Sequence, residues 1–212
     1  MNILAFGAHP DDIEYGCGGT LLQFTENGDE VFLMIFTRGE CGGKADVRCE
    51  EQQAAAKVLH ARELYWGGFT DTEIPGGKEL INRMEEVIRR TQPDLIFVNY
   101  WDDTHQDHRT LSQAAISATR YIRNVLFYES PTTENFNPQI YVNITDVLDR
   151  KLSLLKTHAS QVLKTNIEGH TILEIAHANA TFRGIQGRVK YAEGFAALRY
   201  FINFFPNRSK KD

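Results

Sequence analysis

The amino-acid sequence predicts an α/β fold: a three-layer, Rossmann-like arrangement in which a mainly parallel sheet is flanked by helices. Short apolar runs rich in β-branched and aromatic residues alternate with longer stretches of helical character. Such alternation is typical of a parallel sheet that is covered on both faces and joined by right-handed crossovers. The chain has 212 residues, of which 42% are hydrophobic and 24% charged, and this length and composition are ordinary for one globular domain.

Five apolar runs are the predicted strands, and they cover residues 3–6, 31–36, 64–66, 95–98 and 125–128. Four predicted helices lie between them, over residues 19–27, 50–60, 79–91 and 111–121. In the third helix, Leu80, Met84 and Val87 recur at the three-and-four spacing of an amphipathic helix. We expect Gly28 to close the first helix and Pro93 to end the third, because proline cannot continue a helix.

The chain changes character after Ser130 and Pro131. A stretch rich in proline, threonine and asparagine leads into the apolar segment 140–142. We expect helices from residue 146 to about 158 and from 169 to about 182, then a glycine-containing segment at 184–187 and an aromatic segment at 200–205. The sequence contains no internal repeat or low-complexity linker. We therefore predict one domain over residues 1–212, in which the C-terminal part, about 131–212, packs on the core and shapes a substrate pocket.

The composition argues against several classes of protein. The net charge of −5 provides no electrostatic footprint for nucleic acid, and the only basic cluster, at residues 208–211, is typical of a solvated chain end. No apolar stretch approaches the roughly 20 residues that span a bilayer. The apolar N-terminal run is interrupted by His9 too early for a signal peptide. Three cysteines without a Cys-x-x-Cys motif suit a reducing compartment, so we expect a cytoplasmic protein with no nucleic acid or membrane partner.

Two clusters of histidine and aspartate each follow a predicted strand. Residues 9–12 (His-Pro-Asp-Asp) come shortly after the first strand, ahead of the glycines at 16–19, which we expect to form a turn. Residues 105–108 (His-Gln-Asp-His) come after the strand at 95–98 and its loop. The carboxyl ends of parallel strands meet at one edge of the sheet, where such folds bind ligands. An aspartate alone is often a helix N-cap, and a histidine alone is often an ordinary loop residue. The repeated pattern nevertheless favours a divalent-metal site.

Spacing within the clusters assigns different tasks to neighbouring residues. His9 and Asp12 are three residues apart at a strand-to-helix junction, which brings their side chains to the same side. Asp11 and Asp12 point in different directions, so we expect one of them to bind the metal and the other to face the incoming water. Either His105 or His108 completes the site, because catalytic zinc takes three protein ligands and keeps one position open.

The residues that remain after metal binding have expected roles of their own. A bound metal lowers the pKa of its water to roughly 7 and polarises the carbonyl under attack. A free carboxylate can act as general base, and a free imidazole can stabilise the oxyanion or protonate the leaving group. Asp107, between the two histidines, could orient one of them. This set of groups points to hydrolysis.

Other functions fit the sequence less well. A dinucleotide site is disfavoured, because the G-x-G-x-x-G fingerprint is absent and the paired acids near Gly7 would repel a pyrophosphate. A non-catalytic sugar-binding module would not need the complete set of base and metal ligands. A metal-dependent hydrolase of another bond, such as a phosphoester, remains an alternative. Phosphate recognition usually recruits Lys or Arg, however, and neither cluster contains one.

These motifs resemble those of the PIG-L/LmbE-like family of metal-dependent N-deacetylases, and the resemblance covers most of the chain. Known members act on N-acetylglucosamine conjugates, including intermediates of GPI anchors, mycothiol and bacillithiol. Ile13 stands where many members carry glutamate, although an Ile-Glu pair is familiar among bacterial members. The matching segments are residues 8–14 with the glycines that follow, 37–40, Arg48 with Glu51 and Ala55, 103–108, 158–161 and 191–195.

The resemblance implies a zinc site made of His9, Asp12 and His108, and so chooses His108 over His105 as the third ligand. Such a site also accepts Fe(II), manganese or cobalt. The implied reaction is removal of the N-acetyl group from an amino-sugar conjugate, with release of acetate and a free amine. The resemblance also implies a homo-oligomer, either a trimer or a hexamer.

The resemblance implies further roles around the metal. Asp11 would be the general base, His105 would stabilise the tetrahedral intermediate or protonate the amine, and Asp107 would hold a histidine in place. Arg48 would reach towards the substrate's sugar. His158, in the His-Ala-Ser-Gln segment, would line the rim of the pocket.

Overall fold

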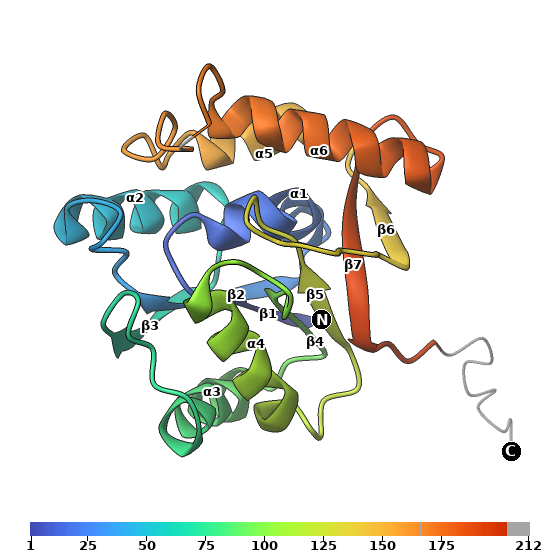
Figure 1. Ribbon diagram of the computed structural model, residues 1–212. Coiled ribbons are helices and arrows are strands. Elements are labelled where there is room, and N and C mark those ends of the chain that lie inside the picture. Colours follow the sequence, from blue (N-terminus) through green and yellow to red (C-terminus); the bar gives the residue numbers. More distant parts are fainter. Residues whose placement is uncertain (166, 203–212) are drawn as a thin grey trace, which may run out of the picture.

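The structure is a computed structural model that describes residues 1–165 and 167–202 (Figure 1). Residues 203–205 of the predicted aromatic segment and the basic cluster at 208–211 lie outside the described residues. Its elements are β1 (Asn2–Gly7), α1 (Asp12–Glu26), β2 (Glu30–Thr37), α2 (Ala45–Val58), β3 (Glu63–Phe69), α3 (Lys78–Thr91), β4 (Leu95–Asn99), α4 (Gln106–Ala118), β5 (Val125–Tyr128), β6 (Ile140–Asn143), α5 (Leu148–Leu155), α6 (Ile172–Gly187) and β7 (Ala192–Arg199).

The strands form one seven-stranded sheet in the order β3-β2-β1-β4-β5-β7-β6. Strands β1 to β5 run parallel, and β7 runs antiparallel to both of its neighbours. The predicted α/β fold with a mainly parallel sheet is therefore confirmed. The chain builds β2 and β3 on one side of β1, then returns to add β4 and β5 on the other. This reversal creates a crevice at the carboxyl ends of β1 and β4.

Helices cover both faces of the sheet (Figure 1). The α1 and α2 helices lie on one face, α3 and α4 lie on the other, and α5 and α6 form a further layer outside α1. Alternate residues of β1 belong to two separate hydrophobic cores. Leu4 and Phe6 pack towards α3 and α4, whereas Ile3 and Ala5 pack towards α1 and α2. A parallel sheet buried on both faces explains why the strands appear as continuous apolar runs. Within the described residues, no helix combines the length and apolarity needed to cross a bilayer.

Three helices begin five or more residues earlier than the sequence predicted. The α1 helix begins at Asp12 rather than 19, α2 at Ala45 rather than 50, and α4 at Gln106 rather than 111. The first turn of α4 is polar, so it carries no apolar periodicity, and His108 lies in this helical turn rather than in a loop. In the C-terminal part, α5 is shorter than predicted, and α6 extends through the glycine-containing segment 184–187.

The glycines at 16–19 do not form the predicted turn but lie inside α1. A Cβ at Gly16 would stand 2.0 Å from Cδ2 of Tyr128, so this position of α1 requires glycine to approach β5. The Tyr128 hydroxyl donates a hydrogen bond to the carbonyl of Phe6 at 2.7 Å, which ties β5 to the strand that precedes the first cluster. The glycines therefore permit close packing of helix on sheet.

Strand β7 was not predicted, because its apolar residues are mostly alanine and are interrupted by Glu193 and Gly194, so the sequence lacks a clear β-branched or aromatic run. It is docked on α1 by Glu193, whose side chain is buried. The carboxylate accepts hydrogen bonds from the backbone N–H groups of Gly19 and Thr20 at 2.8 and 2.7 Å. It also pairs with the buried Lys151 ammonium of α5 at 2.6 Å. One carboxylate thus joins β7, α1 and α5.

Removing the Glu193 carboxylate should destabilise the fold. Glu193→Ala leaves the Lys151 ammonium buried without its partner, which costs about 3–5 kcal/mol in the free energy of unfolding. Replacing both charges together, as in Glu193→Leu with Lys151→Met, should cost less, because no unpaired charge remains. Urea unfolding monitored by circular dichroism measures both values.

The matched control is Glu86→Ala, which removes a carboxylate from an exposed ion pair with Arg90. That change should cost less than about 1 kcal/mol. Equal losses for Glu193→Ala and Glu86→Ala would contradict the docking role of Glu193.

Candidate active site

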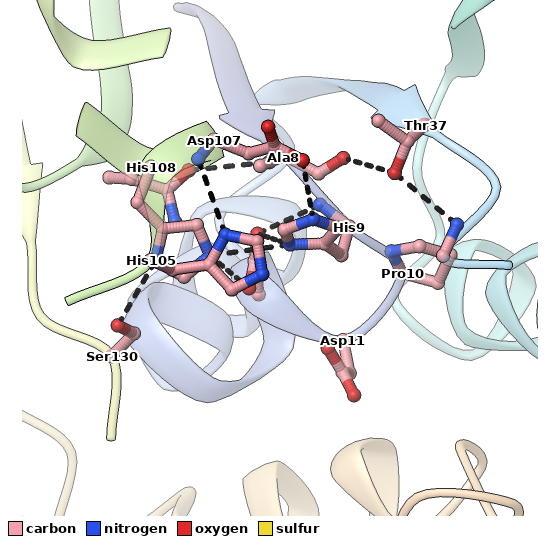
Figure 2. Close-up of polar contacts among 12 residues, drawn as sticks. Ala8, His9, Pro10, Asp11, Thr37, His105, Asp107, His108 and Ser130 are labelled. Atoms are coloured by element: carbon pink, nitrogen blue, oxygen red, sulfur yellow. Dashed lines mark hydrogen bonds and ion pairs between the residues drawn. The ribbon is translucent and has the colours of Figure 1, made fainter. Parts of the chain in front are cut away.

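The two predicted clusters meet at the carboxyl ends of β1 and β4. His9 lies in the connection from β1 to α1, His105 is the N-cap residue of α4, and His108 lies in the first turn of that helix. Figure 2 shows the three imidazoles facing one another, with Asp11 pointing away from them. The ring centroid of His9 is 4.5 Å from that of His105 and 5.3 Å from that of His108.

Ligand atoms of three residues, His9, Asp12 and His108, lie around one point. The Nδ1 atom of His9 is 3.3 Å from Nε2 of His108, which is 3.3 Å from Oδ1 of Asp12. Oδ2 of Asp12 is 3.5 Å from Nδ1 of His9. Ligands at about 2.0–2.1 Å from a tetrahedral zinc ion are about 3.3–3.4 Å apart. The residues present therefore fit a metal ion of this kind.

The far nitrogen of each of these two imidazoles is held by a buried carboxylate. Nε2 of His9 is 3.1 Å from Asp107, and Nδ1 of His108 is 3.0 Å from Asp103. These contacts turn the remaining nitrogens towards the shared point, as in carboxylate–histidine–metal arrangements. Burial alone would lower the pKa of both imidazoles. The carboxylates outweigh it, raising the pKa of His9 well above its usual value and that of His108 to about 9. Negative charge is thus in excess here, which favours a cation.

Two aspartates of this site were missed by the sequence analysis. Asp71 follows β3, is buried, and places Oδ1 3.0 Å from Nε2 of His9. Asp103 was recognised only as part of a matching segment, with no role assigned. Both follow the carboxyl ends of parallel strands, and this shared position is the signal that could have identified them.

His105 lies beside the point on which the ligand atoms of His9, Asp12 and His108 converge. Its ring nitrogens lie close enough to those of His9 and His108 for an alternative three-histidine set. However, its Nδ1 accepts a hydrogen bond from the backbone N–H of Asp107 at 3.2 Å. Burial lowers the pKa of His105, and the two other imidazoles lower it further, so the ring is neutral. With Nδ1 acting as acceptor, the proton of the neutral ring lies on Nε2. His105 can therefore donate a hydrogen bond.

Asp11 occupies the N-cap position of α1, but its carboxylate makes no capping hydrogen bond. The ordinary explanation of an N-cap aspartate therefore does not apply. Burial raises the pKa of Asp11 to about 6, although the charge of Arg48 opposes the shift. A carboxyl group that titrates near neutrality suits a general base.

Arg48, on α2, is buried beside Asp11. Its guanidinium donates to the carbonyls of Gly39 and Pro10 at 2.8 and 2.6 Å, and Nη2 is 3.4 Å from Oδ2 of Asp11. A Cβ at Gly39 would stand 2.1 Å from Nη1 of Arg48, so glycine is needed there to admit the guanidinium. Arg48 borders the pocket, but its donors are directed largely at the backbone.

His158 does not line the rim of the pocket. It is 1% exposed, and its Nε2 lies 3.3 Å from Oε2 of Glu14, which is itself fully buried. The chain turns inwards after α5, and this turn carries the imidazole beneath the site rather than to its edge.

The pocket in front of these groups has a volume of about 380 Å³. One wall contains Arg48 together with five residues of the two clusters: His9, Asp11, Asp12, His105 and His108. The opposite wall comes from the C-terminal part of the chain, and its lining residues include Pro131, Leu155, Gln161, Lys164, Thr165 and Ile172. The site is therefore a cleft with a polar, metal-fitting floor.

The chain is similar to several known proteins. The sequence is 34% identical over 167 residues to the uncharacterized deacetylase YaiS of Escherichia coli (strain K12), covering 74% of this chain and 90% of that protein. It is 26% identical over 200 residues to a probable N-acetyl-alpha-D-glucosaminyl L-malate deacetylase 2 of Bacillus cereus, covering 84% and 88%. The structure of N,N'-diacetylchitobiose deacetylase from Pyrococcus horikoshii superposes with a TM-score of 0.82 at 26% identity, covering 96% and 86%.

The sequence profile of the PIG-L family, described as GlcNAc-PI de-N-acetylase, matches residues 4–119. This match spans more than half of the chain and includes both histidine–aspartate clusters. The chain therefore belongs to the PIG-L family of N-deacetylases.

Proposed function

We propose that this N-deacetylase is a zinc-dependent hydrolase that removes the acetyl group from an N-acetylglucosamine-type conjugate. The products would be acetate and a free amine. Two comparisons support the substrate class, because the relatives from Bacillus cereus and Pyrococcus horikoshii are named for N-acetylglucosamine-containing substrates. The reaction would take place in the 380 Å³ pocket, because the histidines and Asp11 line it.

One observation carries the proposal: the convergence of His9, Asp12 and His108 on a single point, with the far nitrogen of each imidazole held by a carboxylate. These three residues would hold the metal. When bound there, a divalent ion activates a water molecule and polarises the amide carbonyl. Zinc is proposed because the donor set and its spacing suit a tetrahedral ion.

Asp11 is the proposed general base. Its carboxylate takes no part in the convergence of His9, Asp12 and His108 and borders the pocket, where it can accept a proton from the attacking water. The same carboxyl group can return the proton to the departing nitrogen, which completes the hydrolysis of the amide. Its pKa of about 6 lets it exist as a base at neutral pH and still hold a proton during the reaction.

His105 is proposed to stabilise the tetrahedral intermediate. The neutral ring can donate from Nε2, which is not engaged in the capping hydrogen bond of Nδ1 and would donate to the developing oxyanion. Asp107 acts through His9, whose Nε2 it holds. Arg48 is proposed to contact the sugar at the edge of the pocket. The C-terminal part of the single domain 1–212, about 131–212, is proposed to shape the conjugate side of this pocket.

Asp11→Ala should lower kcat by about 10²–10⁴-fold, the usual contribution of a general base. Bound zinc should be unchanged, because the three ligand atoms are intact. Steady-state kinetics with measurement of metal content on the purified variant test both points. The control is Asp149→Ala, which removes an exposed aspartate of α5. Near-normal turnover in Asp11→Ala would show that the base assignment is wrong.

Asp103→Asn should weaken zinc binding by about 10–100-fold, because the amide no longer holds Nδ1 of His108 as a carboxylate does. His108→Ala should lose more, because it removes a ligand. Competition with a fluorescent chelator gives the affinities. His177→Ala, an exposed histidine of α6, is the matched control. Unchanged affinity in His108→Ala would exclude this ligand set.

The reaction itself is tested with metal-free and zinc-reloaded protein on four compounds. These are N-acetylglucosamine, its 6-phosphate, N,N'-diacetylchitobiose and N-acetyl-α-D-glucosaminyl L-malate. We expect zinc-dependent release of primary amine and acetate in equal amounts from at least one of them. Release of inorganic phosphate without amine would indicate hydrolysis of another bond. No release from any compound, with one zinc bound per chain, would count against this substrate class.

A further inference from the structure

We propose that helix α2 holds the reactive conformation of Asp11 through a buried side chain, Gln52, which acts as a positioning residue together with Arg48. The proposal deepens the function proposed above and rests on it, because it takes Asp11 to be the general base.

Asp11 has a backbone conformation that needs support. Its φ is 93° and its ψ is −22°, in the left-handed region that residues other than glycine rarely adopt. Such a conformation persists where surrounding contacts determine it. The Asp11 carboxylate does not supply these contacts, since it makes no capping hydrogen bond with α1. Within the turn, the N–H of Asp12 donates to the carbonyl of His9 at 3.4 Å, and the N–H of His9 donates to Oδ2 of Asp12 at 2.8 Å. These bonds do not involve the peptide unit between Pro10 and Asp11, so the support of that peptide comes from outside the turn.

Helix α2 binds both polar atoms of the peptide unit between Pro10 and Asp11. The N–H of Asp11 donates to Oε1 of Gln52 at 3.3 Å, and the carbonyl of Pro10 accepts from Nη2 of Arg48 at 2.6 Å. Arg48 and Gln52 are four residues apart on α2, so they lie on the same helix face. Holding both atoms fixes the plane of this peptide. Because α1 begins immediately afterwards, a fixed plane also fixes φ of Asp11.

The orientation of the Gln52 amide is itself determined. Its Nε2 donates to Oε1 of Glu14 at 2.7 Å, and both side chains are fully buried. A carboxylate only accepts hydrogen bonds, so the amide must turn its nitrogen to Glu14 and its oxygen to the N–H of Asp11. The other oxygen of Glu14 lies 3.3 Å from Nε2 of His158. A buried polar chain thus runs from His158 to the backbone of Asp11.

Gln52 is absent from the residues that line the pocket, whereas Arg48 borders it. A change at Gln52 therefore removes no side chain that borders the substrate, and it acts through the neighbours of Gln52, which are the backbone of Asp11 and the side chain of Glu14. Because Gln52 does not border the substrate, a loss of activity in a Gln52 variant reports on the position of Asp11 rather than on a lost substrate contact. Gln52 is therefore the residue to change.

The test is a double-mutant cycle on the zinc-loaded full-length protein, with whichever of the four compounds above is hydrolysed fastest. Gln52→Leu should lower kcat by about 10–100-fold, the scale of a misplaced catalytic group. KM and zinc content should be unchanged. In the Asp11→Ala background, Gln52→Leu should lower the residual kcat by less than about twofold, because the group that it positions is already absent. A crystal structure of Gln52→Leu should show Asp11 outside the left-handed region.

Gln53→Leu is the matched control, because Gln53 is the exposed neighbour on the same helix. Gln52→Asn provides a second variant if Gln52→Leu does not fold, since the shorter amide cannot bridge Glu14 and Asp11 together. Equal losses of kcat in both backgrounds, or a crystal structure of the variant with Asp11 still left-handed, would overturn the proposal. Normal turnover in Asp11→Ala alone would instead show that Asp11 is not the general base. The crystal structure of Gln52→Leu would then still show whether Gln52 positions Asp11.

Discussion

The pairing of buried imidazoles with buried carboxylates is the interaction on which the site depends. Asp107 holds one nitrogen of His9, and Asp103 holds one nitrogen of His108. Each contact fixes a ring orientation, and together they leave the two free nitrogens beside Asp12. Buried carboxylates are costly unless they are paired, so this density of aspartate is stable only around positive charge. The same physics that orients the ligands also favours a metal between them.

The sheet supplies the scaffold for this pairing. The two clusters belong to strands that are neighbours in the sheet but far apart in the sequence, since β1 pairs with β4. Both face the crevice where the strand order reverses. Gly16 admits Tyr128 against α1, and the Tyr128 hydroxyl bonds to Phe6 two strands away, close to where the first cluster begins. The packing of α1 against β5, below the site, thus helps to set the distance between the two histidine–aspartate clusters.

Much of this arrangement could be predicted from the sequence, and the exceptions have physical causes. Four of the five parallel strands, β1, β2, β4 and β5, are mostly buried, so their apolar runs were clear. Residues 9–12 and 105–108 were identified because histidine and aspartate repeat at one spacing. The first turn of α4 was missed because polar site residues replace its apolar pattern. Asp71 carries no motif and depends on the fold for its position near His9. The buried place of His158 likewise depends on how the C-terminal part packs.

Helix α2 connects the two walls of the pocket. Gln52 and Arg48 bind the peptide that precedes the carboxylate of Asp11. Between them, Glu51 accepts hydrogen bonds from the backbone N–H and the hydroxyl of Ser160, both at 2.7 Å. Ser160 directly precedes Gln161, which lines the opposite wall. One helix therefore contacts both the turn that carries the proposed base and the segment that borders the substrate. The polar residues of this helix face therefore join the two segments, although they lie outside the metal site.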